Sequence, residues 1–200
     1  RKDFKGKRIL FSSSEKFLGE SEIYIITVPT PVNKKKKPDL FLLKHACKIV
    51  GKHITKNNII VIESTVYPGV TEEICGSTLQ KVSGLTCGKD FFLGYSPERI
   101  NPGDKKHRLE TITKVISGQN DFTLKKLKTI YGKIIPGKIF LAKNIKTAEA
   151  AKVIENAQRD INIAFINEIT KIFSRLHISV TDVLEVARTK WNFLDFRPGL

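Results

Sequence analysis

Short apolar runs alternate with segments of helical periodicity through the first 144 residues of the chain. Runs rich in Ile, Val and Phe predict strands, and segments with apolar positions every three to four residues predict helices. Their alternation predicts an α/β fold in which helices cover a mostly parallel sheet. The unbroken apolar run at residues 59–62 suits a strand buried on both faces. The predicted strands are residues 8–11, 23–28, 59–63, 91–95, 114–117 and 138–142, and the predicted helices are residues 39–50, 71–82 and 122–131.

The strand pattern stops near Asn144, and two helical segments follow at residues 147–176 and 181–188. Ser179 stands where the second of these helices needs a cap, and Asp182 comes three residues later. We therefore expect two parts, a sheet-containing part at residues 1–144 and an all-helical part at residues 145–200.

The long predicted helix carries a narrow polar face opposite an apolar one. An ammonium on that polar face can stabilise a developing oxyanion, and an amide one turn later can orient the same reacting group. Lys152 and Asn156 have this spacing. The alternative is an ordinary amphipathic helix with a solvated charged face. The polar face holds Glu149, Lys152, Asn156 and Asp160, and the opposite, core-seeking stripe holds Ile154, Ala157, Ile161, Ala164 and Phe165.

Three successive strand ends carry loops of unusual composition, at residues 26–31, 63–69 and 95–104. Ligands bind outside the carboxyl ends of the strands in open α/β sheets, so the three loops predict a composite site. Glu98 is its candidate acid or base, and the Thr65 hydroxyl suits a water molecule or a cofactor amide. The alternatives are stiff proline turns, and Ser64 and Thr65 hydroxyls that only satisfy backbone groups.

The formal charge of +15 favours nucleic acid, acidic membranes or phosphorylated ligands. The lysines are dispersed, however, and the one compact block, at residues 34–37, precedes Pro38 in a predicted loop rather than a recognition helix. A solvated surface is the preferred interpretation, so we expect neither nucleic acid nor a membrane as partner. No apolar run has the length of a membrane span.

The three cysteines are odd in number and, like the four histidines, lack metal-ligand spacing. We therefore expect no metal site and no disulfide scaffold, which fits a reducing cytoplasm. The sequence opens at Arg1 and contains no methionine, so we expect a fragment of a longer protein.

Five motifs, taken in order, resemble the UDP-glucose/GDP-mannose dehydrogenase family: residues 27–31, 63–69, 95–104, 148–156 and 196–200. The resemblance is greatest to the branch acting on UDP-N-acetylhexosamines, because Pro97-Glu98 is followed by Arg99-Ile100. It implies NAD-dependent oxidation of a sugar C6 hydroxyl to a carboxylate, through two hydride transfers and a cysteine thioester. It also implies a role in polysaccharide precursor synthesis.

The resemblance also implies roles for single residues. Lys152 matches a lysine that stabilises oxyanions and assists proton movement, and Asn156 matches an amide that binds the sugar near its reacting carbon. Glu98 matches a carboxylate of the acid and base steps, and together with Arg99 it belongs to the implied substrate site. Thr65 matches a threonine that positions water and nicotinamide. The implied cofactor loop is Val28, Pro29 and Thr30.

By the same resemblance, residues 1–144 are a partial, Rossmann-like NAD-binding domain without its first βαβ unit. Residues 145–200 begin a central helical domain whose long helix forms a homodimer. No Gly-x-Gly-x-x-Gly fingerprint occurs, and none of Cys47, Cys75 or Cys87 stands where the family has its nucleophile. We therefore expect the chain to be inactive by itself. The alternatives are a hydroxyacid dehydrogenase, a basic nucleic-acid-binding protein and an inert remnant.

Overall fold

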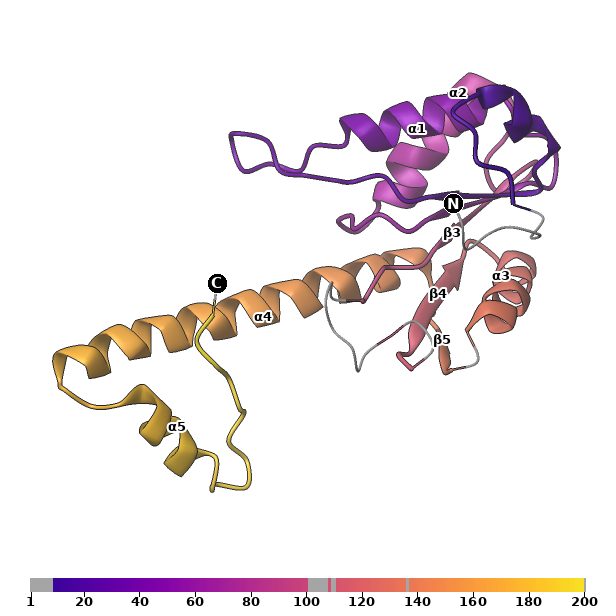
Figure 1. The fold of residues 1–200 in the computed structure, drawn as a ribbon. Coiled ribbons are helices and arrows are strands. Elements are labelled where there is room, and N and C mark those ends of the chain that lie inside the picture. The colour runs from indigo at the N-terminus through magenta and orange to yellow at the C-terminus, as the bar shows by residue number, and fades with distance from the viewer. Residues whose placement is uncertain (1–8, 101–107, 109–110, 136, 200) are drawn as a thin grey trace. The chain divides into compact units, whose positions relative to one another are not determined.

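The computed structural model describes residues 9–100, 108, 111–135 and 137–199, and the chain divides into two compact units, Arg1–Ala150 and Ala151–Leu200. The first unit is a five-stranded sheet with helices on both faces (Figure 1). The second contains most of the long helix α4 together with α5.

The sheet has the order β1-β2-β3-β4-β5, and its strands are paired in parallel except for β3 and β4. This confirms the predicted α/β fold with a mostly parallel sheet. The register aligns Ile23 with Ile59 and Ile59 with Phe92, so β1, β2 and β3 begin at one edge and end at the other. The strands are β1 (Ile23–Ile26), β2 (Ile59–Ile62), β3 (Phe92–Tyr95), β4 (Lys114–Gly118) and β5 (Ile139–Leu141).

Helices close to the predicted positions connect β1 to β2, β2 to β3 and β4 to β5. The caps are local: the Asn120 side chain accepts from the Thr123 amide at 2.8 Å and so begins α3. The predicted helix at residues 71–82 is in fact two pieces, because a π-helical turn after Gly69, which has a φ of 97°, precedes α2. The elements are the 3₁₀ helix η2 (Glu15–Glu20), α1 (Phe41–Gly51), the π-helix η3 (Val70–Gly76), α2 (Ser77–Ser83) and α3 (Asp121–Ile134).

One of the six predicted strands, at residues 8–11, is wrong. Residues 9–11 lie outside every strand, and the side chains of Ile9, Leu10 and Phe11 are exposed. An apolar run becomes a strand only when a neighbouring edge supplies hydrogen bonds and a covering layer buries its side chains, and this run has neither among the described residues.

Two apolar clusters fix the sheet between its helices. On one face, Ile60 and Ile62 pack with Leu43 of α1 and Leu79 of α2. On the other face, Ile59 and Val61 pack with residues of α3. All four residues of β2 are therefore buried, as the unbroken run predicted. Full burial of such a side chain contributes about 1.5–3 kcal/mol, which makes β2 the centre of the fold.

Helix α4 (Ile145–Arg175) begins where the Asn144 side chain accepts from the Thr147 amide at 2.8 Å. Helix α5 (Val180–Ala187) begins at Ser179, which accepts from the Asp182 amide as predicted. No helix among the described residues is both long and apolar enough to span a bilayer.

The stripe predicted to seek the core on α4 is not buried. Ile154 and Ile161 are 65% and 66% exposed, and Phe165 is also exposed. The periodicity identified an apolar face, but these three side chains stay exposed among the residues that the structure describes.

Candidate functional site

The loops that follow β1, β2 and β3 lie at the same edge of the sheet, because these strands are parallel. Side chains join two of the loops: the Thr30 hydroxyl donates to the Thr65 carbonyl at 2.5 Å, and the Ser64 hydroxyl donates to the Val28 carbonyl at 2.6 Å. The Ser64 hydroxyl therefore satisfies a backbone carbonyl, which was the alternative interpretation of this residue. Thr65 is exposed at this edge, next to Thr30, to which its carbonyl is bonded.

Glu98 is also exposed at this edge, and its loop holds it in place. Its Oε1 accepts from the backbone amides of Arg99 and Ile100, both at 2.7 Å. The Arg99 guanidinium donates to the Thr113 carbonyl at 3.1 Å, which ties the loop to the chain before β4. Residues 101–104 of this motif lie outside the described residues.

A buried charged cluster, which the sequence analysis missed, lies next to this loop. Lys114, at the start of β4, is 3% exposed and its ammonium lies 3.1 Å from the Glu63 carboxylate. The Tyr131 hydroxyl donates to the same oxygen at 2.6 Å. Glu63 and Glu98 line one cavity of about 220 Å³, together with Lys114 and Tyr131. The sequence did hold a signal for this cluster: Glu63 directly follows one apolar run and Lys114 directly precedes another. A charged residue beside a buried strand needs a partner of opposite charge, which predicts that the two could pair.

Tyr131 predicts a pH dependence of stability. Burial raises the pKa of its phenol, and the nearby Glu63 carboxylate raises it further through its charge and hydrogen bond. Because the folded pKa lies above the unfolded value of about 10, the stabilisation is complete below pH 10 and is lost as the pH rises beyond it. Chemical denaturation between pH 9 and 11.5 should show a falling free energy of unfolding, with a shallower fall for Tyr131→Phe. An unchanged slope in that variant, or an equal change in the exposed control Tyr67→Phe, contradicts the assignment.

Glu149 has a different place from the one predicted. We expected it on the exposed polar face of the long helix, but it is fully buried within the first unit. Its carboxylate accepts from the backbone amides of Gly69 at 2.6 Å and Thr71 at 2.9 Å. These amides open η3 and have no partners inside that helix, so a carboxylate there satisfies donors and favours the helix dipole.

Lys152 and Asn156 lie on α4 within the second unit, and both are partly buried. The Arg159 guanidinium donates to the Asn156 side-chain oxygen at 3.1 Å. Arg159 also lines a cavity of about 460 Å³ that α4 forms with residues 195–197, including Phe196 and Arg197. Two hydrogen bonds hold that segment on α4: the Asn167 amide donates to the Gly199 carbonyl at 2.7 Å and accepts from the Gly199 amide at 3.1 Å.

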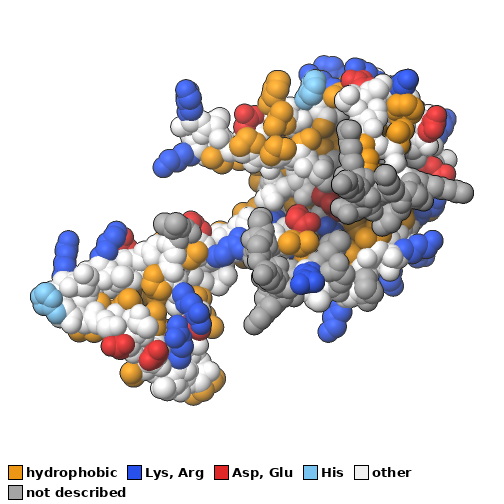
Figure 2. Space-filling model, in the orientation of Figure 1, with side chains coloured by type: hydrophobic (Ala, Val, Ile, Leu, Met, Phe, Trp, Pro, Cys, Tyr) orange, Lys and Arg blue, Asp and Glu red, His pale blue; other side chains and the backbone are white. Residues whose placement is uncertain are grey.

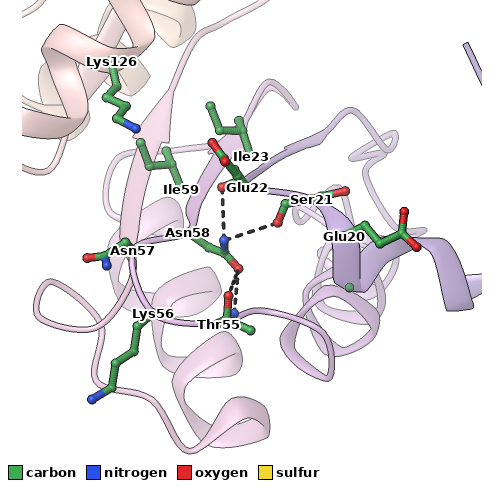
Figure 3. A pocket seen from close by; sticks show the side chains of 11 residues that line it. Glu20, Ser21, Glu22, Ile23, Thr55, Lys56, Asn57, Asn58, Ile59 and Lys126 are labelled. Atoms are coloured by element: carbon green, nitrogen blue, oxygen red, sulfur yellow. Dashed lines mark hydrogen bonds between the residues drawn. The ribbon is translucent and has the colours of Figure 1, made fainter. Parts of the chain in front are cut away.

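A further cavity, of about 360 Å³, lies at the opposite, amino-terminal edge of β1 and β2 (Figure 3). Asn58 occupies its wall, accepting from Thr55 and donating to the carbonyls of Ser21 and Glu22. Because Asn58 is already engaged by protein groups and the cavity is remote from the strand-end loops, we assign it no part in the site.

The predicted site residues thus fall into two sets. Val28, Pro29, Thr30, Thr65, Glu98 and Arg99 belong to the first unit, and Lys152 and Asn156 belong to the second. The structure shows what holds Thr30, Glu98 and Arg99 in the first set and Asn156 in the second. That the two sets meet around one substrate stays a prediction.

Comparison with known proteins identifies relatives over the whole chain. Two profiles of the UDP-glucose/GDP-mannose dehydrogenase family match it: the NAD binding domain over residues 1–135 and the central domain over residues 146–200. The chain is 54% identical over 196 residues to Protein CapL of Staphylococcus aureus, covering 98% of this chain and 46% of that protein. It is 53% identical to a UDP-N-acetyl-D-glucosamine 6-dehydrogenase of Salmonella typhi, covering 95% of this chain and 45% of the relative.

Among solved structures, a UDP-D-ManNAc dehydrogenase from Pyrococcus horikoshii superimposes with a TM-score of 0.86 at 32% identity. That match covers 94% of this chain and 44% of the other. The chain therefore spans less than half the length of the relatives it matches.

Proposed function

Because this chain belongs to the UDP-glucose/GDP-mannose dehydrogenase family, we propose that it is part of an NAD-dependent nucleotide-sugar 6-dehydrogenase. The proposed substrate is a UDP-N-acetylhexosamine, whose C6 hydroxyl is oxidised to a carboxylate. The observation that carries the proposal is that both family profiles match in order, together with 53% identity to a UDP-N-acetyl-D-glucosamine 6-dehydrogenase. The three strand-end motifs argue against a hydroxyacid dehydrogenase.

The residues of the first unit fit the nicotinamide end of NAD. Parallel strands place Val28, Pro29, Thr30 and Thr65 at one edge, and the Thr30 to Thr65 hydrogen bond ties these loops into one surface. Polar groups outside the carboxyl ends of parallel strands are the usual setting for dinucleotides. NAD, when bound, supplies the hydride acceptor. No Gly-x-Gly-x-x-Gly fingerprint occurs among these 200 residues.

The proposed chemistry assigns each site residue a task. The Lys152 ammonium stabilises negative charge on the C6 oxygen as hydride leaves, and the Asn156 amide fixes the orientation of the sugar. Thr65 positions the water that the second oxidation consumes. Glu98 exchanges protons, and its two backbone hydrogen bonds set the direction of its carboxylate.

The cavity beside α4 supports the substrate assignment. Arg159 and Arg197 bring positive charge suited to a diphosphate, beside the carboxylates of Glu155 and Asp195, and Phe196 offers an aromatic face to a base. Arg159 also holds Asn156, so the cavity wall and the proposed sugar-binding amide are joined by a hydrogen bond.

We further propose that residues 1–144 serve as the cofactor domain, and that residues 145–200 form a homodimer through α4. The exposed stripe on α4 supports a second copy as the covering partner, because a long helix face with Ile154 and Ile161 about two-thirds exposed needs burial. Figure 2 shows hydrophobic side chains on the surface of this unit. Sedimentation of the chain as a monomer at micromolar concentration contradicts the homodimer.

The proposed compartment is the cytoplasm, where NAD and nucleotide sugars are available, and the proposed product is a uronic acid precursor of a polysaccharide. The three cysteines, Cys47, Cys75 and Cys87, are free thiols, which fits a reducing compartment.

The test of the proposed function is turnover by a chain extended at both ends to the length of its relatives. Mixed with NAD and UDP-N-acetylglucosamine, it should reduce two NAD and consume one water for each sugar converted to a carboxylate. The epimer UDP-N-acetylgalactosamine and UDP-glucose serve as comparisons. A folded extended chain that reduces no NAD with either N-acetylhexosamine refutes the proposal.

A further inference from the structure

A buried ion pair, Lys114 with Glu63, stands where β4 begins and β2 ends, and it has no role in the proposed chemistry so far. The Lys114 ammonium lies 3.1 Å from the Glu63 carboxylate, with 3% and 17% of the two side chains exposed. The Tyr131 hydroxyl donates to the same carboxylate oxygen at 2.6 Å, and the ammonium lies 5.5 Å from the centre of the Tyr131 ring. Stability alone does not account for this cluster, because well-packed apolar side chains of similar volume serve a core as well or better.

Glu98 shares a cavity with this cluster. Glu63 and Glu98 both line its volume of about 220 Å³, together with Lys114 and Tyr131. Two carboxylates that line one small cavity repel each other, and the ammonium offsets that repulsion. Burial raises the pKa of Tyr131, the Glu63 carboxylate raises it further, and the charge of Glu98 adds to the effect. The buried cluster and the candidate acid or base are therefore electrostatically connected.

The start of β4 also holds the loop that follows β3. The Thr113 carbonyl accepts from the Arg99 guanidinium at 3.1 Å, and the Val115 carbonyl accepts from the Ser96 hydroxyl at 2.8 Å. These two carbonyls belong to the residues on either side of Lys114. The loop is therefore attached to β4 both before and after its candidate acid or base.

Glu63 makes the corresponding connection to the loop that follows β2. Its backbone amide donates to the Ile26 carbonyl at 2.9 Å, at the end of β1. The next two residues are Ser64, whose hydroxyl holds the Val28 carbonyl, and Thr65. The ion pair therefore joins the strand end that precedes Thr65 to the strand that holds the loop after β3.

We propose that Lys114, through its buried ion pair with Glu63, is a positioning residue of the nucleotide-sugar oxidation. The pair fixes the loops after β2 and β3 relative to each other, and thereby fixes where Thr65 and Glu98 meet the reacting atoms. The inference rests on the proposed function for the roles of these two residues. A charged pair suits this role because its geometry is directional, whereas apolar contacts are not.

The first experiment compares the 200-residue chain with the double variant Lys114→Met, Glu63→Gln, which leaves no unpaired buried charge and keeps an acceptor for the phenol. Exchange of the Arg99 and Ile100 amides with water, followed by NMR, should become at least about 5-fold faster. The reason is that both amides donate to the Glu98 carboxylate, which is then less firmly positioned. Amides in the centre of β2 should exchange as in the parent chain.

The second experiment uses a chain extended to the length of its relatives. The double variant should lower kcat with UDP-N-acetylglucosamine at least about 10-fold and change both KM values less, because small displacements of reacting groups are costly. Lys114→Arg keeps a cation for Glu63 and should retain more of the parent rate than the double variant does. The matched control, Lys52→Met with Glu15→Gln, neutralises an exposed ion pair of the same unit and should match the parent chain.

Parent-like exchange of the two loop amides in the double variant overturns the proposal. So does faster exchange that spreads equally through β2, which is the result expected of a purely structural pair. An extended double variant that turns over at the parent rate also overturns it and leaves the proposed oxidation standing. An extended parent chain that reduces no NAD refutes the proposed function instead, and the amide exchange, which needs no turnover, tells the two failures apart.

Discussion

Lys152→Ala, in a chain extended to the length of its relatives, is expected to slow NAD reduction with UDP-N-acetylglucosamine at least about 100-fold. The ammonium is the proposed partner of the negative charge that develops on the C6 oxygen. Removing a charge-stabilising group of this kind leaves that charge unsupported in the transition state but affects ground-state binding less. We therefore expect the loss mainly in kcat, measured by steady-state kinetics with both substrates varied.

Lys171→Ala is the matched control, because Lys171 is an exposed lysine on the same helix, paired with Glu168 at 2.6 Å. It should turn over at close to the parent rate. Lys152→Arg keeps the charge but changes its geometry, so it should recover part of the loss. Near-normal turnover by a folded Lys152→Ala chain refutes the role, as does an equal loss in the Lys171 variant.

Glu149→Ala is expected to lower the free energy of unfolding by about 3 kcal/mol. The substitution removes a fully buried carboxylate that accepts from the Gly69 and Thr71 amides. Both donors then stay buried without a partner, and the start of η3 loses the negative charge beside its dipole. Urea denaturation of the 200-residue chain measures the effect.

Glu149→Gln keeps one acceptor oxygen and should fall between the parent chain and Glu149→Ala. Glu185→Ala removes an exposed carboxylate from the helix α5 and should change stability by less than about 0.5 kcal/mol. A Glu149→Ala chain as stable as the Glu185→Ala chain contradicts the capping role.

Local patterns were enough to predict most of the elements. The unbroken apolar run of β2 identified a strand buried on both faces, and the structure buries all four of its residues. Ser179 marked the start of a helix, because a cap forms within four residues and needs no tertiary information. The parallel strands also placed the three strand-end loops at one edge, as predicted.

Features that depend on distant partners were not predictable in this way. From the sequence, Glu149 belongs to a polar helix face. Its role as a buried cap depends on its contact with Gly69, about 80 positions earlier in the chain. In the sequence, Lys114 and Glu63 stand at the ends of separate predicted strands. They come together because β4 runs antiparallel to β3, so that β4 begins at the edge where β2 ends. The run at residues 8–11 reads as a strand, but periodicity says nothing of whether an edge is available for pairing.

The site shows the same division. Sequence motifs predicted Thr65, Glu98, Lys152 and Asn156 as site residues. The structure adds that two backbone amides of its own loop hold the Glu98 carboxylate, and that Arg159 holds the Asn156 side chain. Whether residues of the two units act on one substrate depends on their relative placement, which no local pattern encodes.

The most direct test of the central claim is a crystal structure of the extended chain with NAD and UDP-N-acetylglucosamine bound. The claim predicts that the sugar C6 lies in contact with Lys152 and Asn156 of α4 and, on its other side, faces Thr65 and Glu98 of the strand-end loops. A sugar held by only one of these two sets, with the other facing solvent elsewhere, contradicts it.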